Sequence, residues 1–401
     1  MEIPNEYQIV DYRKMEAFKK HTMGNYQKSD VLSAYQKSLN NGNIDEACHW
    51  MVELLVSGHI EEIWLKLLSV GSKSVNIANP SLPQYLYYRY SQYINLVSKP
   101  EFHNDFIIRT RNVQEIRNHL AEITAIIATS AKNVISKTPK ISKEEFRIDN
   151  FKMQLDAIEY KLVDNITMPE DPPEVKVVAN EIAYRIKESF SSFDRCNYWI
   201  HWLLEWEKIS SKKCGKFQCG YRGKNYIKPQ FAHDFIWLIW DVIFQELNQR
   251  KTHHNNKTKS QIKALYELYC YQFSASNKKK KIFLLVHAIL LLTMEINWAV
   301  PVINNYPVVL QSSANINFLF ADYKQIEQSK CLNQDLPYQL NTFDNYIVPQ
   351  EMGGIQHGKV GRANGKAKGK KGKKNKPALD SESIRKLEFA NRIQDKLYNL
   401  D

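Results

Sequence analysis

The chain has 401 residues and a formal net charge of +12 at pH 7, and its apolar and charged fractions, 43% and 24%, are those of a globular protein with a buried core. Only seven of its 14 glycines fall within residues 1–352. Doubly wound α/β domains, β/α barrels and β-sandwiches need glycines at their turns. The scarcity excludes these folds and predicts an all-α body of antiparallel amphipathic helices.

Residues 1–28 show no periodicity and are expected to be irregular, whereas 29–136 form the first predicted helical domain. Its first helix is expected to end at Gly42, because glycine readily takes the left-handed conformation found at helix ends. Asn43 followed by Glu46 predicts a capping box at the start of the second helix. Further amphipathic helices are expected over 60–71, between Pro80 and Lys99, and over 113–134.

Residues 137–172 are predicted to be a linker holding one helix, with an apolar face made of Phe151, Leu155, Ile158 and Leu162. The linker ends at Pro172 and Pro173, which cannot propagate a helix. The second helical domain, 173–330, is expected to hold helices over 175–190, 194–209, 230–250, 261–273, 282–299 and 315–328, while 302–310 could be extended. Its tryptophans predict an aromatic core in which Trp199, Trp202 and Trp206 lie opposite Trp237 and Trp240.

Residues 331–379 are predicted to be a disordered, Gly/Lys-rich basic linker, because their composition cannot bury enough apolar area to order it. Nine cations and no acid lie in 18 of these residues, which leaves +3 on the rest of the chain; they are Lys359, Arg362, Lys366, Lys368, Lys370, Lys371, Lys373, Lys374 and Lys376. Such a segment is typical of an electrostatic arm that binds DNA or RNA. The alternatives are a solubility tail and a nuclear-import signal.

Residues 380–401 are predicted to form a terminal amphipathic helix, with Ile384, Leu387, Ile393 and Leu397 on one face. A short helix tethered beyond a basic linker is typical of a peptide that docks in a groove of a protein partner. The alternative is a nascent helix without a role.

A second candidate nucleic-acid contact is the basic segment 210–228, which has no acid and three of the seven body glycines. Cations interleaved with aromatic residues suit a nucleic-acid strand, because cations neutralise phosphates and rings stack on bases. The same composition also fits a flexible surface loop. Its candidate contacts are Lys212, Lys213, Lys216, Arg222 and Lys224.

No catalytic or nucleotide-binding motif is present, so we expect neither enzymatic activity nor a cofactor. The nearest metal pattern is Cys214-x4-Cys219, which Cys196, His201 or His233 could complete. One close pair of cysteines predicts zinc only weakly, and two ordinary thiols are the alternative. Six dispersed cysteines without a signal peptide indicate a reducing compartment. The longest apolar run, 282–294, is too short to span a bilayer.

The first helical unit resembles the C-terminal helical (collar) domain of clamp-loader-related ATPases, in the replication-associated recombination branch. The resemblance covers residues 29–82 and depends on Ser33-Ala34-Tyr35-Gln36-Lys37-Ser38, Gly42-Asn43-Ile44-Asp45-Glu46-Ala47, Ser57-Gly58 and Asn76-Ile77-Ala78-Asn79-Pro80. The ATPase module is absent, so the resemblance implies helical packing and homo-oligomerisation but no hydrolysis. We expect Tyr87 and Tyr90 at that interface, with Tyr85 and Tyr88 facing inward.

Three segments, Asp11-Tyr12, His21–Asp30 and Arg117–Ile123, are similar to a conserved protein family of nucleocytoplasmic large DNA viruses. This resemblance implies a location in the host cytoplasm, in a viral factory, or in the virion. The sequence therefore predicts a non-enzymatic, DNA-associated helical scaffold that acts in viral genome replication, late expression or packaging. The alternative is an internal or minor structural protein of the virion, and an enzyme without a recognisable motif is a third reading.

Overall fold

The computed structural model describes residues 3–331, except 12, 103, 135–137, 188–192, 216–217, 224–225 and 251–254, and only the backbone of 104–107, 214 and 328–331. Within this part of the chain, thirteen α-helices, several 3₁₀ segments and one π-helical turn (Gly71–Val75) make up the regular structure, and no strand is present. The predicted all-α fold is confirmed. The linker 331–379, with its nine cations, and the terminal helix 380–401 lie outside the described residues, apart from Cys331 at the end of the last helix.

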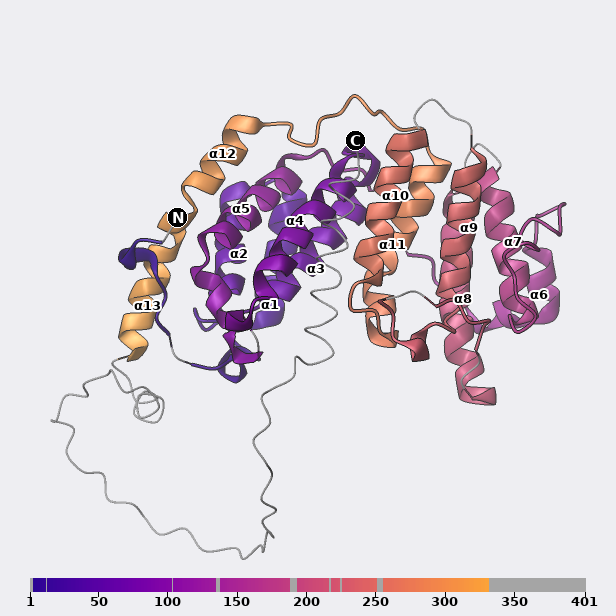
Figure 1. Ribbon diagram of the computed structural model, residues 1–401, viewed down its shortest axis with the longest axis horizontal. Helices are drawn as coiled ribbons and strands as arrows, with labels where there is room; N and C mark the ends of the chain where they lie inside the picture. The colour runs from indigo at the N-terminus through magenta and orange to yellow at the C-terminus, as the bar shows by residue number, and fades with distance from the viewer. Residues whose placement is uncertain are drawn as a thin grey trace, which may run out of the picture.

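The first five helices form a group on one side of the molecule (Figure 1). Gly42 ends the first helix with a φ of +78°, as predicted. The expected capping box at Asn43 does not form; its side-chain amide instead donates to the Glu46 carboxylate at 3.1 Å. Val134 lies beyond the last of these helices and is exposed. The helices are α1 (Lys28–Asn41), α2 (Ile44–Val56), α3 (Ile60–Val70), α4 (Leu82–Val97) and α5 (Gln114–Thr129).

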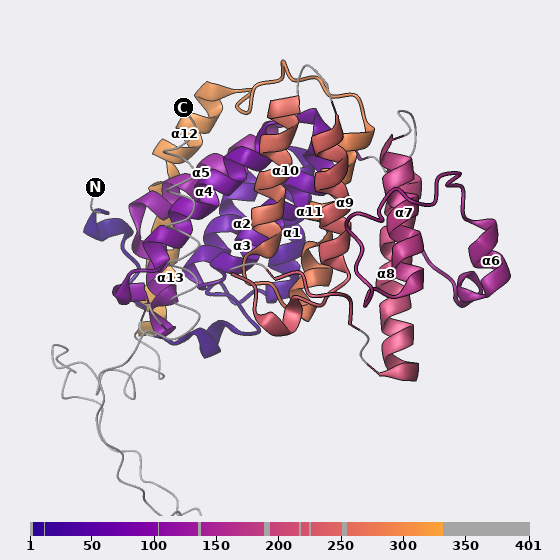
Figure 2. The same ribbon diagram turned by 45° about the vertical axis from the view of Figure 1, so that its right-hand side comes forward.

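The next six helices continue the row, and α6 stands at its far end in both side views (Figures 1 and 2). The four buried tryptophans belong to one hydrophobic core, in which Trp199 and Trp202 contact Phe151, whereas Trp237 and Trp240 contact Tyr269. The helices are α6 (Ile148–Met153), α7 (Pro173–Lys187), α8 (Phe193–Cys214), α9 (Ile236–Gln249), α10 (Asn255–Cys270) and α11 (Ala275–Thr293).

The prediction of a helix through 151–162 is wrong beyond Met153. Backbone N–H groups that follow Met153 bond to a side chain of α7 instead of to helix carbonyls. The buried Glu181 carboxylate accepts the N–H groups of Asp156 and Ala157, the latter at 2.8 Å. A longer helix would have used these donors internally. Ile158, expected on the apolar face, is 75% exposed.

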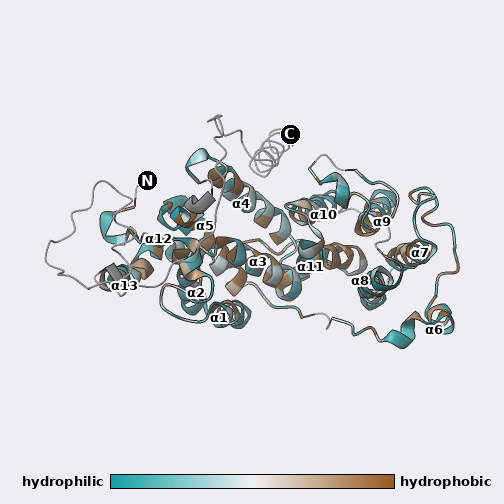
Figure 3. Ribbon diagram, turned by 90° about the horizontal axis from the view of Figure 1, so that it is seen from below, coloured by the Kyte–Doolittle hydropathy of each residue, from teal (hydrophilic) through white to brown (hydrophobic). Residues whose placement is uncertain are grey.

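The last two helices, α12 (Tyr306–Ala314) and α13 (Ala321–Cys331), return to the first group, where α12 packs on α5 (Figure 1). The predicted extended segment 302–310 is therefore helical from Tyr306. Buried residues of all three groups belong to one continuous hydrophobic core, and the division into domains at 29–136 and 173–330 stays a prediction. Seen from below, apolar residues concentrate where α3 and α11 lie against their neighbours (Figure 3).

A buried arginine joins the last helices to the beginning of the chain. Arg117, on α5, donates to the backbone oxygens of Arg111 and Tyr7 at 2.6 and 3.0 Å, and to the Asn317 amide oxygen at 2.9 Å. Its guanidinium also lies 3.4 Å from the centre of the Phe320 ring. Burial and the neighbouring Arg111 lower the pKa of Arg117 to about 9. This residue therefore holds the N-terminal segment, α5 and the turn Ile316–Phe320 together.

The core also contains His287, whose ring nitrogens have no hydrogen-bond partner among the described residues. Burial lowers the pKa of His287 to about 3. Between this value and the usual pKa of about 6.5, only the unfolded chain binds the proton, so stability falls as the pH falls. The wild-type protein should lose about 2 kcal/mol of its free energy of unfolding between pH 6.5 and pH 5 because of His287, and His287→Leu should not show this loss. Urea unfolding at the two pH values measures this difference, and an unchanged pH dependence would contradict the assignment.

Candidate functional site

The structure corrects the prediction that Arg222 contacts nucleic acid. Its side chain is 2% exposed and pairs with Asp171 at 2.6 Å and with Asp241 at 3.1 Å. Burial alone would raise the pKa of Asp171, but hydrogen bonds and charge from Arg222, with the N–H groups of Met168 and Gly220, hold it below its usual value. Arg222 therefore joins the segment 166–171 to α9 and is not available to a phosphate.

The rest of this basic segment is only partly described. Lys212 and Lys213 are exposed near the end of α8, as a nucleic-acid contact requires, whereas Lys216 and Lys224 lie outside the described residues. Gly220 approaches Met168 so closely that a Cβ atom would lie 2.6 Å from the Met168 Cβ. At least one glycine of the segment therefore serves packing rather than flexibility.

The cysteine pair also falls in this segment. Cys219 is buried and burial raises the pKa of its thiol to about 12, which disfavours the thiolate that binds metal. His233, one of the proposed completing ligands, directs its Nδ1 to the Cys219 backbone oxygen at 2.9 Å. The Cys214 side chain is not described. Across the described residues, no three His, Cys, Asp or Glu side chains are grouped so that they could hold a metal ion.

The structure contradicts the prediction of which α4 tyrosines face outward. Tyr90 is 4% exposed and packs against Trp64 and Tyr271, with ring centres 4.9 and 5.3 Å apart. Tyr87 is half-buried against the core, and Tyr88, expected to face inward, is exposed. Tyr90 thus joins α4 to α3 and to the turn after α10, so removing it would damage the core rather than dissociate an oligomer.

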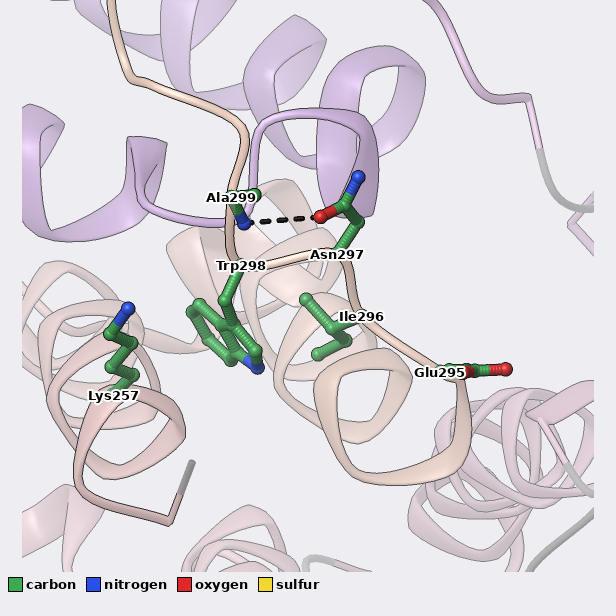
Figure 4. A pocket seen from close by; sticks show the side chains of 6 residues that line it. All are labelled: Lys257, Glu295, Ile296, Asn297, Trp298 and Ala299. Carbon is green, nitrogen blue, oxygen red and sulfur yellow. Dashed lines mark hydrogen bonds between the residues drawn. The ribbon is translucent and has the colours of Figure 1, made fainter. Parts of the chain in front are cut away.

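An open pocket of about 680 Å³ lies between the first turn of α10 and the turn that follows α11 (Figure 4). Its volume is within the range of about 300–1,000 Å³ that is common for ligand sites. Lys257 stands on one side, the half-buried indole of Trp298 lies next to it, and Glu295 points away from both. The lining residues are Lys257, Glu295, Ile296, Asn297, Trp298 and Ala299.

The Trp298 turn has a definite local structure. Helix α11 ends at Thr293, and Met294 takes an extended conformation. The Asn297 side-chain oxygen accepts the N–H of Ala299 at 3.1 Å, a bond that asparagine commonly makes in turns and that places Trp298 between the two (Figure 4). Pro301 follows and disfavours a return to helix at the preceding residue. Trp298 therefore lies on a bonded turn and not on the helix predicted over 282–299.

Both walls of the pocket are fixed to the region where α4 begins. Gln261 of α10 accepts the Gln84 N–H at 2.9 Å, and the two side-chain amides bond at 3.1 Å. On the other side, the buried amide of Asn79 donates to the Val302 backbone oxygen at 2.8 Å and to Ser130 Oγ at 3.1 Å. The pocket is consequently preformed, because its two sides are attached to positions only five residues apart.

One lysine, Lys257, lines the pocket together with Trp298, and two more lysines lie farther along α10. Lys257 and Lys263 of α10 are exposed and Lys259 is half-buried, and none of them forms an ion pair with another described residue. Residues 255–266 contain no acid. A tryptophan beside an ammonium group is a combination that suits a planar ligand whose attached anionic group contacts the ammonium. The amino-acid sequence gave no signal for this site. Trp298 fell within a predicted helix, and Lys257 lies 41 positions before it in the chain.

Comparisons with known proteins add no relative: no protein-family model, curated protein or solved structure matches the chain. Among the described helices, none has the length and the apolar character needed to cross a membrane.

We expect Asn79→Ala to loosen the Trp298 turn and lower the free energy of unfolding by about 1–3 kcal/mol, because the Ser130 and Val302 oxygens lose the buried Asn79 amide as their donor. Hydrogen exchange should show faster exchange in 294–304, with α7 unchanged. Unchanged exchange in this segment would show that the Asn79 bonds do not hold the pocket. Asn43→Ala, which removes an exposed asparagine, is the matched control.

Proposed function

We propose that this chain is a non-enzymatic helical scaffold that binds nucleic acid through its C-terminal basic segment during viral genome replication, late expression or packaging. The observation that carries the proposal is the segregation of charge. Nine cations without an acid lie in residues 359–376, whereas only +3 remains on the other residues. A protein that neutralises phosphates in this way gains affinity from counterion release.

Contacts in the folded body support this division. The buried ammonium of Lys278 pairs with Glu207 at 2.6 Å and Asp234 at 2.8 Å. Arg89 pairs with Glu122 at 2.6 Å. These cations, like Arg222, are used to join helices. A nucleic-acid strand would therefore depend on the basic segment and on exposed lysines such as Lys212 and Lys213.

The test compares the full chain with a variant in which all nine cations of 359–376 are replaced by glutamine. We expect binding to labelled DNA at 50 mM salt to weaken by about 100-fold or more in the glutamine variant. A matched control keeps the composition of 359–376 but shuffles its order, and it should bind like the wild type because the attraction depends on charge. Equal binding by all three proteins would remove the basic segment from the function.

The place of action is tested separately. Imaging of infected cells should find the protein with DNA in cytoplasmic viral factories. Its recovery mainly in purified particles, with little in factories, would favour the internal virion protein instead.

A further inference from the structure

We propose that the outer face of α12 binds the C-terminal segment 380–401 of the same chain, which folds back onto it as an amphipathic helix. This contact goes beyond the proposed function and does not depend on it. The outer face of α12 consists of its exposed residues, Tyr306, Pro307, Leu310, Gln311 and Ala314.

Helix α12 carries apolar residues on both sides, although only one side is covered. Val309 is 3% exposed, and α12 packs against α5. Tyr306 and Leu310 lie one helical turn apart on the outer face and are 59% and 50% exposed. Phe318, in the turn that follows, is 65% exposed and has an edge contact with the Tyr7 ring. A helix that is apolar all round is normally buried, so the outer face has the character of a surface that another segment covers.

The composition around α12 indicates that this segment is protein. Residues 296–321 contain no Lys, Arg, Asp or Glu, in a chain in which these residues make up 24%. Depletion of charge together with aromatic side chains is typical of the centre of a protein interface. A nucleic acid would find no cation for its phosphates on this part of the chain.

The terminal segment 380–401 has a matching pattern. Its sequence predicts a helix with Ile384, Leu387, Ile393 and Leu397 on one face. Helices of this kind bind other proteins by laying their apolar face on a hydrophobic surface. The four cations and five acids of the segment nearly cancel, so an uncharged surface suits it better than a charged one.

The chain between α13 and the terminal segment has the length that favours this contact. Its 48 residues, 332–379, have the Gly-rich composition of a flexible linker, for which the end-to-end distance is about 35–40 Å. The path of helix and turn from Tyr306 to Cys331 spans at most about 40 Å. A linker that matches the span in this way gives an effective concentration of about a millimolar. Even a weak contact would therefore form within one chain before a second copy could compete at micromolar concentration.

The experiment places the photo-cross-linking residue p-benzoylphenylalanine at Tyr306 of the full chain, in an equal mixture of unlabelled and isotope-labelled protein. Mass spectrometry should find this position linked to 380–401 of a chain with the same label. Ile393→Asp with Leu397→Asp should lower the yield of this link by about tenfold or more, because burying one aliphatic side chain contributes a factor of about ten. The same cross-linking residue at Tyr160, which is 80% exposed beyond α6, is the matched control and should give no more than background links to 380–401.

A second variant tests the outer face itself. Leu310→Asp should lower the yield of the Tyr306 link about as much as the double variant, and its half-exposed position should leave the fold intact. Links between labelled and unlabelled chains would overturn the inference, because a second copy would then cover the outer face. No link to 380–401, or an equal yield in the variants and the wild type, would overturn it as well. None of these measurements contains nucleic acid, so the proposed function stands or fails separately.

Discussion

Arg222→Met is expected to lower the free energy of unfolding by about 3–5 kcal/mol, because it leaves the buried carboxylate of Asp171 without its cation. The loss should be measurable as a shift in the urea midpoint. The destabilisation should be smaller at low pH. In the folded state the pKa of Asp171 is depressed, so the stability that its carboxylate contributes is fully present above the usual pKa of about 3.9. That contribution is lost as the pH falls through the pKa of Asp171 in the folded state.

The matched control is Lys212→Ala with Lys213→Ala, which removes two exposed cations from the same basic segment. This double variant should keep wild-type stability within about 0.5 kcal/mol but bind nucleic acid less tightly. The two variants thus separate a structural cation from candidate binding cations. Unchanged stability in Arg222→Met would contradict the structural role assigned to Arg222.

Arg117→Met should be similarly damaging, by about 3 kcal/mol or more, because three oxygens that accept from the buried Arg117 side chain lose a charged donor. The substitution should also increase local opening near Arg117, in addition to lowering the overall stability. Hydrogen exchange should rise in residues 3–11 and in α12, which Arg117 and its turn hold against α5.

Arg147→Met, at an exposed arginine before α6, is the control and should change the stability by less than about 0.5 kcal/mol. Faster exchange confined to α6–α8 in Arg117→Met would contradict the connection between the two ends of the described chain.

Local signals predicted the fold class and several helix ends. The scarcity of glycine indicated helices, and Gly42 ends α1 because it can adopt a φ of +78°. The ends of α6 and α11 could not be predicted in this way. They depend on Glu181, which binds backbone N–H groups of another segment, and on Asn297, which stabilises a turn where the apolar pattern continues.

The phase of α4 was ambiguous because tyrosines occur on several of its faces. Its buried positions include Leu86, Tyr90, Tyr93 and Val97, and Tyr90 is buried because α4 packs against α10 and the Tyr90 ring contacts Trp64 of α3. Only tertiary contacts could decide between this face and the one predicted from Tyr85 and Tyr88.

The Trp298 pocket was beyond sequence reasoning for a related reason. Its walls are fixed by contacts between residues 177 and 223 positions apart, Gln84 with Gln261 and Asn79 with Val302. No motif marks such contacts. The segment 210–228 shows the reverse case: its composition was typical of nucleic-acid binding, yet Arg222 is buried in an ion pair.

The central claim, that the basic segment carries most of the nucleic-acid affinity, is tested most directly by salt dependence. Binding of the full chain and of a truncated 1–352 chain to the same duplex DNA would be measured from 50 to 300 mM salt. If all nine cations contact phosphates, the full chain should show a log–log slope of up to about −8, and the truncated chain a much shallower one. Equal slopes and equal affinities for the two chains would contradict the account.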